Sequence, residues 1–207
     1  MSAESGSLKE AVFPLFVDVA SDVSYRLSAD ALADQSVLVE EISEGGSVPL
    51  LLVENKGDAR VLFLEGEELV GAKQNRILNT SVLIAGHAKV KIPVSCVEQG
   101  RWGYKSKYFG SSGSHSPSKL RRTLKASVTR SVSEDRGHSS DQSAVWKEVS
   151  SLHSTHSVSS RTSAMSDAFD SYQDRINKFQ EQLGYVPGAA GVVVRLIAPI
   201  VGPPGPS

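Results

Sequence analysis

The sequence contains almost no cysteine and no long apolar run. Its single cysteine, Cys96, excludes a disulfide framework and a cysteine-rich zinc site, and it fits a reducing compartment. Nowhere do about 18 apolar residues follow one another, and the amino terminus, MSAESGSLKE, lacks the basic and apolar regions of a secretory signal. We therefore expect a soluble, cytoplasmic protein without a membrane span.

The chain also lacks a large excess of either positive or negative charge. The 22 basic residues stand against 23 acidic residues, which excludes a chain whose large positive excess wraps a polyanion. The charges are unevenly distributed, however, because residues 1–70 carry a net charge of −10, residues 71–136 carry +10 and residues 137–207 carry −1. The neutrality of the chain therefore results from two opposed blocks.

Known catalytic signatures are absent as well. The sequence has no Walker A loop, no GxGxxG after a strand, no HExxH, no GxSxG and no CxxC. The lone cysteine has no suitable base, since His87, the nearest histidine, falls in a turn at the opposite end of the expected strand pair. We therefore expect Cys96 to be a small buried residue and not a nucleophile.

Up to about residue 98 the sequence is typical of short strands with tight turns, and 207 residues suffice for one domain. Strands joined so closely pair antiparallel. Ser28 is expected to cap a short helical turn over residues 29–33. The expected strands cover residues 12–17, 37–42, 48–53, 61–64, 77–84 and 89–94.

After Trp102 the pattern changes. Residues 103–118 are rich in glycine, serine and lysine and predict a flexible loop. Apolar residues then recur at helical spacing, and a last strand is expected over residues 188–197. The helical patterns are Leu120, Leu124, Val128 and Val132; Val145, Val149 and Leu152; and Phe169, Tyr172, Ile176, Phe179 and Leu183.

This order predicts an α+β fold: an N-terminal antiparallel β-sheet or sandwich half, then a helical segment and a final strand. We expect residues 11–197 to form a single domain. Residues 1–10 and the proline-rich residues 198–207 are expected to be disordered.

Two polar segments interrupt the strand pattern, one at residues 65–79 and the other at residues 93–102. If residues 77–84 and 89–94 form a hairpin, both segments come to lie at the same end of the sheet. Carboxylates close to lysine and arginine can supply an acid/base pair and a clamp for phosphate or carboxylate groups. Alternatively, Glu65, Glu67 and Glu98 present oxygen ligands to a hard cation such as Mg²⁺, or these residues are solvated and form weak surface ion pairs.

Residues 101–136 form a basic segment, with nine basic and two acidic residues and several aromatic residues near its start. Such a composition can grip nucleic acid through phosphate contacts and stacking. Packing against the acidic first seventy residues of the same chain fits the charge distribution better. We therefore expect no nucleic-acid partner.

At the two polar segments the sequence resembles the ARG-and-rhodanese-phosphatase-superfamily-associated protein domain, a bacterial family named for gene neighbours that include ADP-ribosylglycohydrolases. The stretches EGEELVGAKQNRILNTSVLI at 65–84 and KIPVSCVEQGRW at 91–102 carry the resemblance. Further similar stretches are FPLF at 13–16, EISEGGSVPLLLVEN at 41–55, SDQSAVWKEV at 140–149 and YVPGAAGVVV at 185–194. Members of the family continue through a further strand and a final helix, so the ending LIAPIVGPPGPS implies a C-terminally short copy.

The resemblance links the chain to ADP-ribose metabolism only by genomic association. Our leading hypothesis is a protein that binds or processes a small phosphorylated ligand such as an ADP-ribose derivative. The alternative is a non-enzymatic interaction module that docks a protein partner and whose motif residues form a structural polar network.

In the leading hypothesis each polar side chain has a role. Glu67 and Glu98 act as general acid and base or as metal ligands. The expected ligand-binding residues are Lys73, Arg76 and Arg101 for phosphates, Gln74, Asn75 and Asn79 for ribose hydroxyls, Trp102 for stacking, and the neighbouring Glu65 and Gln99.

Overall fold

The computed structural model describes residues 9–18, 23–43 and 49–197. Of the disorder expected over residues 1–10 and 198–207, all but residues 9 and 10 lies outside the described residues, and these two belong to a strand. The contacts divide the chain into two compact units. We call Val23–Gln173 the central unit, and Met1–Asp22 together with Asp174–Ser207 the terminal unit. Each is described by itself, and the single domain over residues 11–197 stays a prediction.

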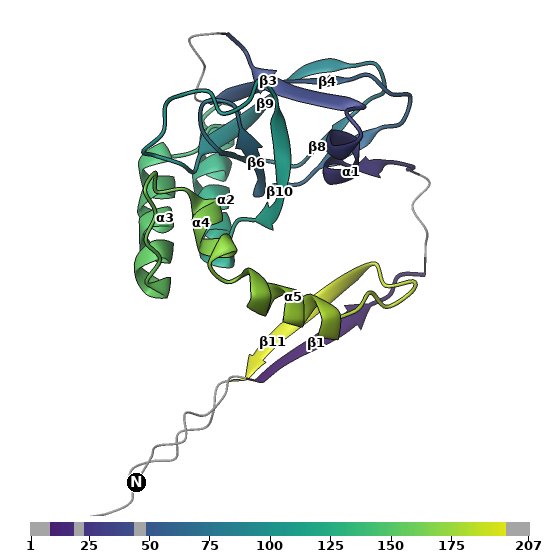
Figure 1. Cartoon of the computed structure of the whole chain (residues 1–207). Coiled ribbons are helices and arrows are strands. Elements are labelled where there is room, and N and C mark those ends of the chain that lie inside the picture. The colour runs from purple at the N-terminus through teal and green to yellow at the C-terminus, as the bar shows by residue number, and fades with distance from the viewer. Residues whose placement is uncertain (1–8, 19–22, 44–48, 198–207) are drawn as a thin grey trace, which may run out of the picture. The chain divides into compact units, whose positions relative to one another are not determined.

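The central unit contains two β-sheets (Figure 1). The larger has the order β10-β6-β7-β9-β4-β3 and is antiparallel throughout; the smaller has the order β2-β5-β8, in which β2 and β5 are parallel. The edge strands β10 and β3 of the larger sheet lie against each other, so this sheet is curled. Its strands are β3 (Val37–Glu41), β4 (Leu50–Asn55), β6 (Glu67–Gly71), β7 (Arg76–Leu78), β9 (Lys89–Cys96) and β10 (Phe109–His115), and those of the smaller sheet are β2 (Arg26–Leu27), β5 (Val61–Phe63) and β8 (Val82–Ile84).

The alternating direction of side chains along β3 and β4 explains the first of two hydrophobic cores. In β3 and β4 every second residue is buried, because successive side chains of a strand point to opposite faces. The apolar ones among these residues pack with Phe63, Leu78 and Ile92 into a cluster that also includes Ala31 of the short helix α1 (Ser28–Ala33). Ser28 is the first residue of α1 and not its cap, since its hydroxyl donates to Glu67.

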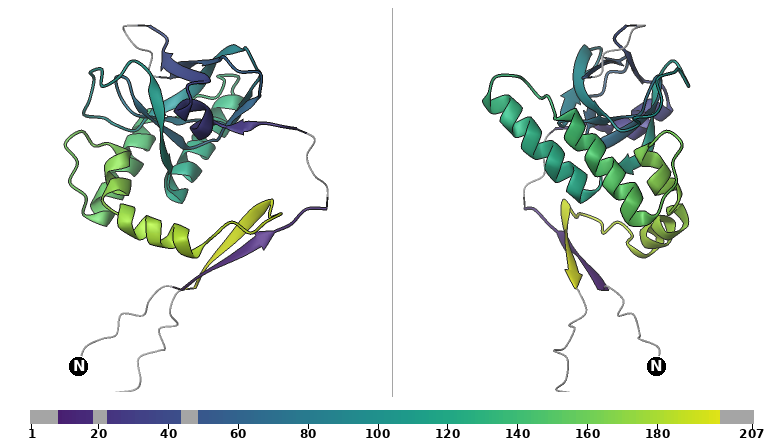
Figure 2. Two further views of the ribbon diagram at one scale, coloured as in Figure 1. Left: turned by 45° about the vertical axis from the view of Figure 1, so that its right-hand side comes forward. Right: turned by 90° about the vertical axis from the view of Figure 1, so that its left-hand side faces the viewer.

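Three helices build the second core. The helices α2 (Ser118–Ser133) and α3 (Gln142–His156) lie side by side, and α4 (Met165–Asp170) packs against α3 (Figure 2). Leu120, Leu124 and Val128 of α2 are buried, as their spacing predicts, and they pack with Ile77 and Val97 next to the sheet. The α+β prediction is thereby confirmed. Among the described residues, no helix is both long and apolar enough to cross a membrane.

In the terminal unit, β1 (Lys9–Leu15) pairs antiparallel with β11 (Gly191–Ile197). The same unit contains nearly all of α5 (Gln173–Gln182). The expectation of a single helix across residues 169–183 is wrong, because the helix is interrupted between α4 and α5. At this break the Ser171 amide still donates to the Asp167 carbonyl at 3.1 Å, but the Tyr172 amide donates to the Phe169 carbonyl, three residues back, at 2.9 Å, so the last turn of α4 tightens.

Two further expectations are corrected. Residues 103–118 are not loop throughout, because 109–115 form β10, whose backbone pairs with β6 despite a sequence of serine and glycine. The strand expected over residues 77–84 is split into β7 and β8, which belong to different sheets. The chain turns between β7 and β8. In this turn the Asn79 side chain donates to the His138 carbonyl, and Ser81 Oγ accepts from the Glu65 amide at 2.9 Å.

Candidate functional site

A bidentate pair between Glu98 and Arg101 forms the centre of the polar segments. Arg101 Nε donates to Glu98 Oε1 at 2.8 Å, and Arg101 Nη2 donates to Glu98 Oε2 at 2.6 Å. The guanidinium also donates to the Ala72 carbonyl at 2.6 Å and to Asn75 Oδ1 at 3.1 Å. Glu98 accepts two more hydrogen bonds at 3.0 Å, from the Asn75 amide and the Thr162 hydroxyl. Through its contacts with Ala72 and Asn75, this pair joins the second polar segment to the first.

These contacts determine the charge of Glu98. Burial favours the neutral carboxyl, but the hydrogen bonds from Arg101, the Asn75 amide and Thr162 outweigh it and lower the pKa of Glu98 below its usual value of 4.5. Glu98 is therefore ionised at neutral pH. Its oxygens are already occupied by protein donors, which favours a structural role, and its role in acid/base chemistry stays a prediction.

Replacing Arg101 by methionine is expected to lower the free energy of unfolding of the central unit by about 3 kcal/mol, because Glu98 would remain buried without its cation. Urea denaturation measures this change, followed by the fluorescence of Trp102 and Trp146, which both belong to the central unit. Lys147→Met, on the exposed face of α3, is the matched control and should change little. A loss no larger than that of the control would contradict the structural role of the pair.

Gln74 joins this pair to the interior of the sheet. Its Nε2 donates to the Glu98 carbonyl at 2.9 Å, and its Oε1 accepts from Arg76 Nη1 at 2.9 Å and from Cys96 Sγ at 3.2 Å. Cys96 is fully buried, as expected for a small core residue. Pairing of β7 with β9 places Arg76 directly opposite Cys96, and in this way the two polar segments meet at one end of the sheet.

Arg76 is the largest fully buried side chain among the residues that the structure describes. Its Nη2 lies 3.6 Å from Glu41 Oε1, and both side chains of this ion pair are almost completely inaccessible to solvent. Nε and Nη2 of Arg76 and both carboxylate oxygens of Glu41 make no hydrogen bond within the described part of the chain. Such groups have lost their hydration without a compensating hydrogen bond, unless a ligand or a water molecule bonds to them.

Glu68 is a second buried carboxyl. β6 pairs Glu68 with Ile77, so its side chain lies on the face that packs against the helices. Desolvation raises the pKa of Glu68 to about 7, although Ser112, Asn75 and the Ser166 backbone lower it. Neither carboxylate oxygen has a hydrogen bond of good geometry among the described residues.

A lysine lies between two aromatic rings beside these groups. Lys73 Nζ lies 5.3 Å from the centre of the Trp102 ring and 5.1 Å from that of Tyr104. Both rings are about half exposed, whereas Lys73 is 9% exposed. Cation–π attraction therefore holds residues 102–104 over the first polar segment.

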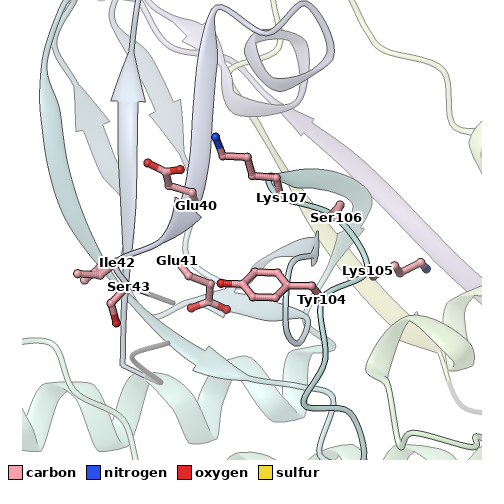
Figure 3. A pocket seen from close by; sticks show the side chains of 8 residues that line it. All are labelled: Glu40, Glu41, Ile42, Ser43, Tyr104, Lys105, Ser106 and Lys107. Carbon is pink, nitrogen blue, oxygen red and sulfur yellow. The ribbon is translucent and has the colours of Figure 1, made fainter. Parts of the chain in front are cut away.

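Next to this lysine an open pocket of about 820 Å³ lies between the end of β3 and residues 104–107. Figure 3 shows Glu40 and Glu41 on one wall, and Tyr104 and Lys107 on the other, with the Tyr104 ring pointing toward the Glu41 carboxylate; Lys105 belongs to the second wall, but its side chain points away from the pocket. A hydrogen bond with Tyr108 raises the pKa of Lys107, so this lysine is charged at neutral pH. The pocket thus offers a cation, carboxylates and an aromatic ring to one ligand.

The second wall of the pocket is attached to the first polar segment. The Lys105 amide donates to the Ala72 carbonyl at 2.9 Å, and Ser106 Oγ accepts from the Ala72 amide at 3.0 Å. Gly71 has a φ of +125°, and a Cβ there would lie 2.5 Å from Ser106 Oγ and 2.9 Å from the Tyr108 carbonyl. Only glycine permits this approach, so Gly71 fixes where the wall lies.

The other expected site residues have separate surroundings. Glu65 pairs with Lys125 at 3.0 Å, Glu67 accepts from Ser28 and from the Leu64 amide, and Gln99 is exposed. Asn79 bonds to the Ser95 hydroxyl and to the His138 carbonyl. Their role in ligand binding stays a prediction.

The magnesium alternative receives no support from this arrangement. Glu65, Glu67 and Glu98 each bond to a different protein partner. In the described ranges, no three side chains of histidine, cysteine, aspartate or glutamate gather as metal ligands.

Sequence reasoning missed the residues that line the pocket, namely Glu40, Glu41, Tyr104, Lys105 and Lys107. A signal existed in WGYKSK at residues 102–107, where two aromatic residues and then two lysines follow one another at the end of the second polar segment. Glu40 and Glu41 gave little signal, because two carboxylates at the end of a strand normally face solvent.

Comparison with known proteins identifies the family. The family model of the ARG and Rhodanese-Phosphatase-superfamily-associated Protein domain matches residues 4–202, which is nearly the whole chain. The chain therefore belongs to this family, as the two polar segments predict. No curated protein and no solved structure matches it.

Proposed function

We propose that this member of the ARG and Rhodanese-Phosphatase-superfamily-associated Protein domain family binds a small phosphorylated ligand with free hydroxyl groups in the pocket between β3 and residues 104–107. The main support for this proposal comes from Glu41. Its buried carboxylate lines the open pocket, and the carboxylate oxygens accept no hydrogen bond from the described residues. A ligand hydroxyl would supply the missing donor.

The charges of the two walls support this class of ligand. Lys107 is exposed at the pocket and can bind phosphate oxygens, whereas the Lys105 side chain points away from it. Glu40 and Glu41 disfavour a ligand that is only anionic, and they accept from ribose or other sugar hydroxyls. The Tyr104 ring offers a face for a base or sugar. An ADP-ribose derivative combines all three features.

In this proposal the polar segments support the pocket and do not line it. The Glu98–Arg101 pair and the Lys73 stack hold residues 101–105 in place, while Arg76 holds Glu41 in the wall. Groups positioned in this way are pre-organised for binding, because less freedom is lost when the ligand arrives.

Calorimetric titration tests the proposal. We expect ADP-ribose to bind the intact protein, and Lys107→Ala to weaken binding about tenfold, since a charged contact to phosphate is lost. Glu41→Gln should weaken ADP-ribose and ribose 5-phosphate but not inorganic phosphate, which lacks a hydroxyl donor of that kind. Lys147→Ala, an exposed lysine of α3 outside the pocket, is the control and should bind as the intact protein does.

A second function, a non-enzymatic interaction module, is favoured by one observation. Glu98 and Arg101 bond to each other and to protein groups, and beside them Trp102 and Tyr104 present about half of their surface to solvent. Exposed aromatic residues are typical of protein interfaces. Failure of ADP-ribose, ribose 5-phosphate and inorganic phosphate to bind the folded protein would overturn the first function and leave this one.

A further inference from the structure

A small cavity of about 280 Å³ lies between the end of α2 and the beginning of α3, and it shares no residue with the pocket described above. Two arginines, Arg130 and Arg136, line it together with four serines and Asp141. Guanidinium and hydroxyl groups are donors that bind phosphate oxygens.

Ser131 is the unusual residue of this cavity. It is 4% exposed, and its hydroxyl has no hydrogen-bond partner within the residues that the structure describes. The neighbouring serines of α2 behave differently, because Ser127 donates to the Leu124 carbonyl at 2.9 Å and Ser133 donates to the Arg130 carbonyl at 2.8 Å. A buried hydroxyl without a partner is rare in proteins and indicates a missing acceptor.

The charged groups around the cavity leave room for an anion. Among the described carboxylates, none forms an ion pair with Arg130, although the charge of Arg130 adds to the larger effect of the Ser143 hydrogen bond in lowering the pKa of Asp141. Arg136 pairs with Glu134, but both side chains are exposed, and such a pair contributes little. Asp141 is occupied as the cap of α3, where its Oδ1 accepts from the amides of Ser143 at 3.0 Å and Ala144 at 3.1 Å.

The wall opposite α2 is held firmly by the sheet. Asn79 Nδ2 donates to the His138 carbonyl at 2.9 Å, and Ser95 Oγ lies 2.5 Å from Ser140 Oγ. The side-chain amide of Gln142 accepts from the Cys96 amide and donates to the Cys96 carbonyl, both at 2.8 Å. Buried residues of β9 and of the turn after β7 thereby fix residues 138–142 in one conformation.

We propose that this cavity binds a phosphate monoester or inorganic phosphate, with Arg130, Arg136 and the Ser131 hydroxyl as donors to its oxygens. The cavity accommodates a phosphate group but is small for a nucleotide. It is therefore a second site, and it does not depend on the proposed function of the larger pocket. The same chemistry is offered by a free phosphorylated metabolite and by a phosphoserine of a peptide.

Titration of the ¹⁵N-labelled full chain with inorganic phosphate and with a phosphoserine peptide tests this site by NMR, against sodium chloride at equal ionic strength. We expect saturable shifts of the Ser139, Ser140 and Gln142 amides. Arg130→Gln should raise the dissociation constant about tenfold, since a charge-assisted contact is lost. Arg122→Gln, an exposed arginine of the same helix, should leave it unchanged.

Ser131→Ala serves as the second variant and should raise the dissociation constant severalfold while keeping the charge of the site. Saturable binding of either probe supports the site, and the probe that binds more tightly shows whether the natural ligand is a free phosphate compound or a phosphoserine peptide. Shifts that do not saturate, or equal weakening by Arg130→Gln and Arg122→Gln, would show general attraction to a basic helix and overturn the proposal. Failure of ADP-ribose to bind the larger pocket has no bearing on this result.

Discussion

At pH 8, replacing Glu68 by glutamine is expected to raise the free energy of unfolding of the central unit by about 3 kcal/mol. The pKa of Glu68 is about 7 in the folded protein, against a usual value of 4.5. Ionisation is therefore harder in the folded state, and each unit of difference corresponds to about 1.4 kcal/mol. Glutamine has nearly the same shape and does not ionise.

The sign of the pH dependence follows from the same shift. Between pH 4.5 and pH 7 the folded protein holds more protons at Glu68 than the unfolded chain does. The contribution of the neutral carboxyl to stability is therefore complete below pH 4.5 and is lost as the pH rises through 7. The intact protein should lose stability over this range, whereas Glu68→Gln should not.

Urea denaturation at pH 5 and pH 8, followed by tryptophan fluorescence, measures this difference. Glu134→Gln, an exposed carboxyl at the end of α2, is the control and should follow the intact protein at both pH values. If Glu68→Gln and the intact protein show equal stability at pH 8, the carboxyl is not desolvated as described.

Loss of Arg76 is expected to destabilise the central unit by about 3 to 5 kcal/mol. In Arg76→Met the Glu41 carboxylate loses its only cation among the described residues while it remains buried. Removing one partner of a buried ion pair costs this much because an uncompensated charge is left in a medium of low polarity. Urea denaturation at pH 7 measures the loss.

A second variant separates the ion pair from side-chain packing. Arg76→Met/Glu41→Gln removes both charges and should recover most of the stability that Arg76→Met loses. Arg60→Met, an exposed arginine of the same unit, should change the free energy of unfolding by less than about 0.5 kcal/mol. A double variant that is less stable than Arg76→Met would show that the guanidinium acts through packing alone.

The meeting of the two polar segments could be predicted from the sequence, because it depends on strand pairing. The apolar runs around Ile77 and Ile92 indicate neighbouring strands, and β7 and β9 do pair. Where the chain turns away from a strand could not be predicted. Between Leu78 and Val82 it leaves one sheet for the other, and the determining contacts of Asn79 are with residues far along the chain.

The opposed charge blocks predicted part of the ion pairing. Among the described residues, three lysine or arginine ion pairs join residues 71–136 to the first seventy residues: Arg76 with Glu41, Lys89 with Glu54, and Lys125 with Glu65. His87 also lies 2.7 Å from Asp58. Composition could not show that the pair of Arg76 with Glu41 is buried and the others exposed. That difference comes from the curl of the sheet, which brings β3 against β10.

The bidentate pair of Glu98 and Arg101 shows a further limit. Both residues were expected to contact a ligand, and their spacing in the sequence is compatible with a free clamp. Whether a carboxylate and a guanidinium bind a ligand or each other depends on backbone donors such as the Asn75 amide, which belongs to another segment. Polar density in a sequence therefore locates a network without assigning its function.

The contact between Gln142 and Cys96 has a consequence for how the helices are attached. Val94 donates its amide to the Pro49 carbonyl, just before β4, and two residues later the Cys96 amide donates to the Gln142 side chain. Like a peptide group, the Gln142 side-chain amide offers one acceptor and one donor to the backbone of β9. α3 is thus joined to the sheet by one rung of β-type hydrogen bonding. The direction of these two bonds, and not only the shape of the apolar contacts, sets the position of the helix along β9.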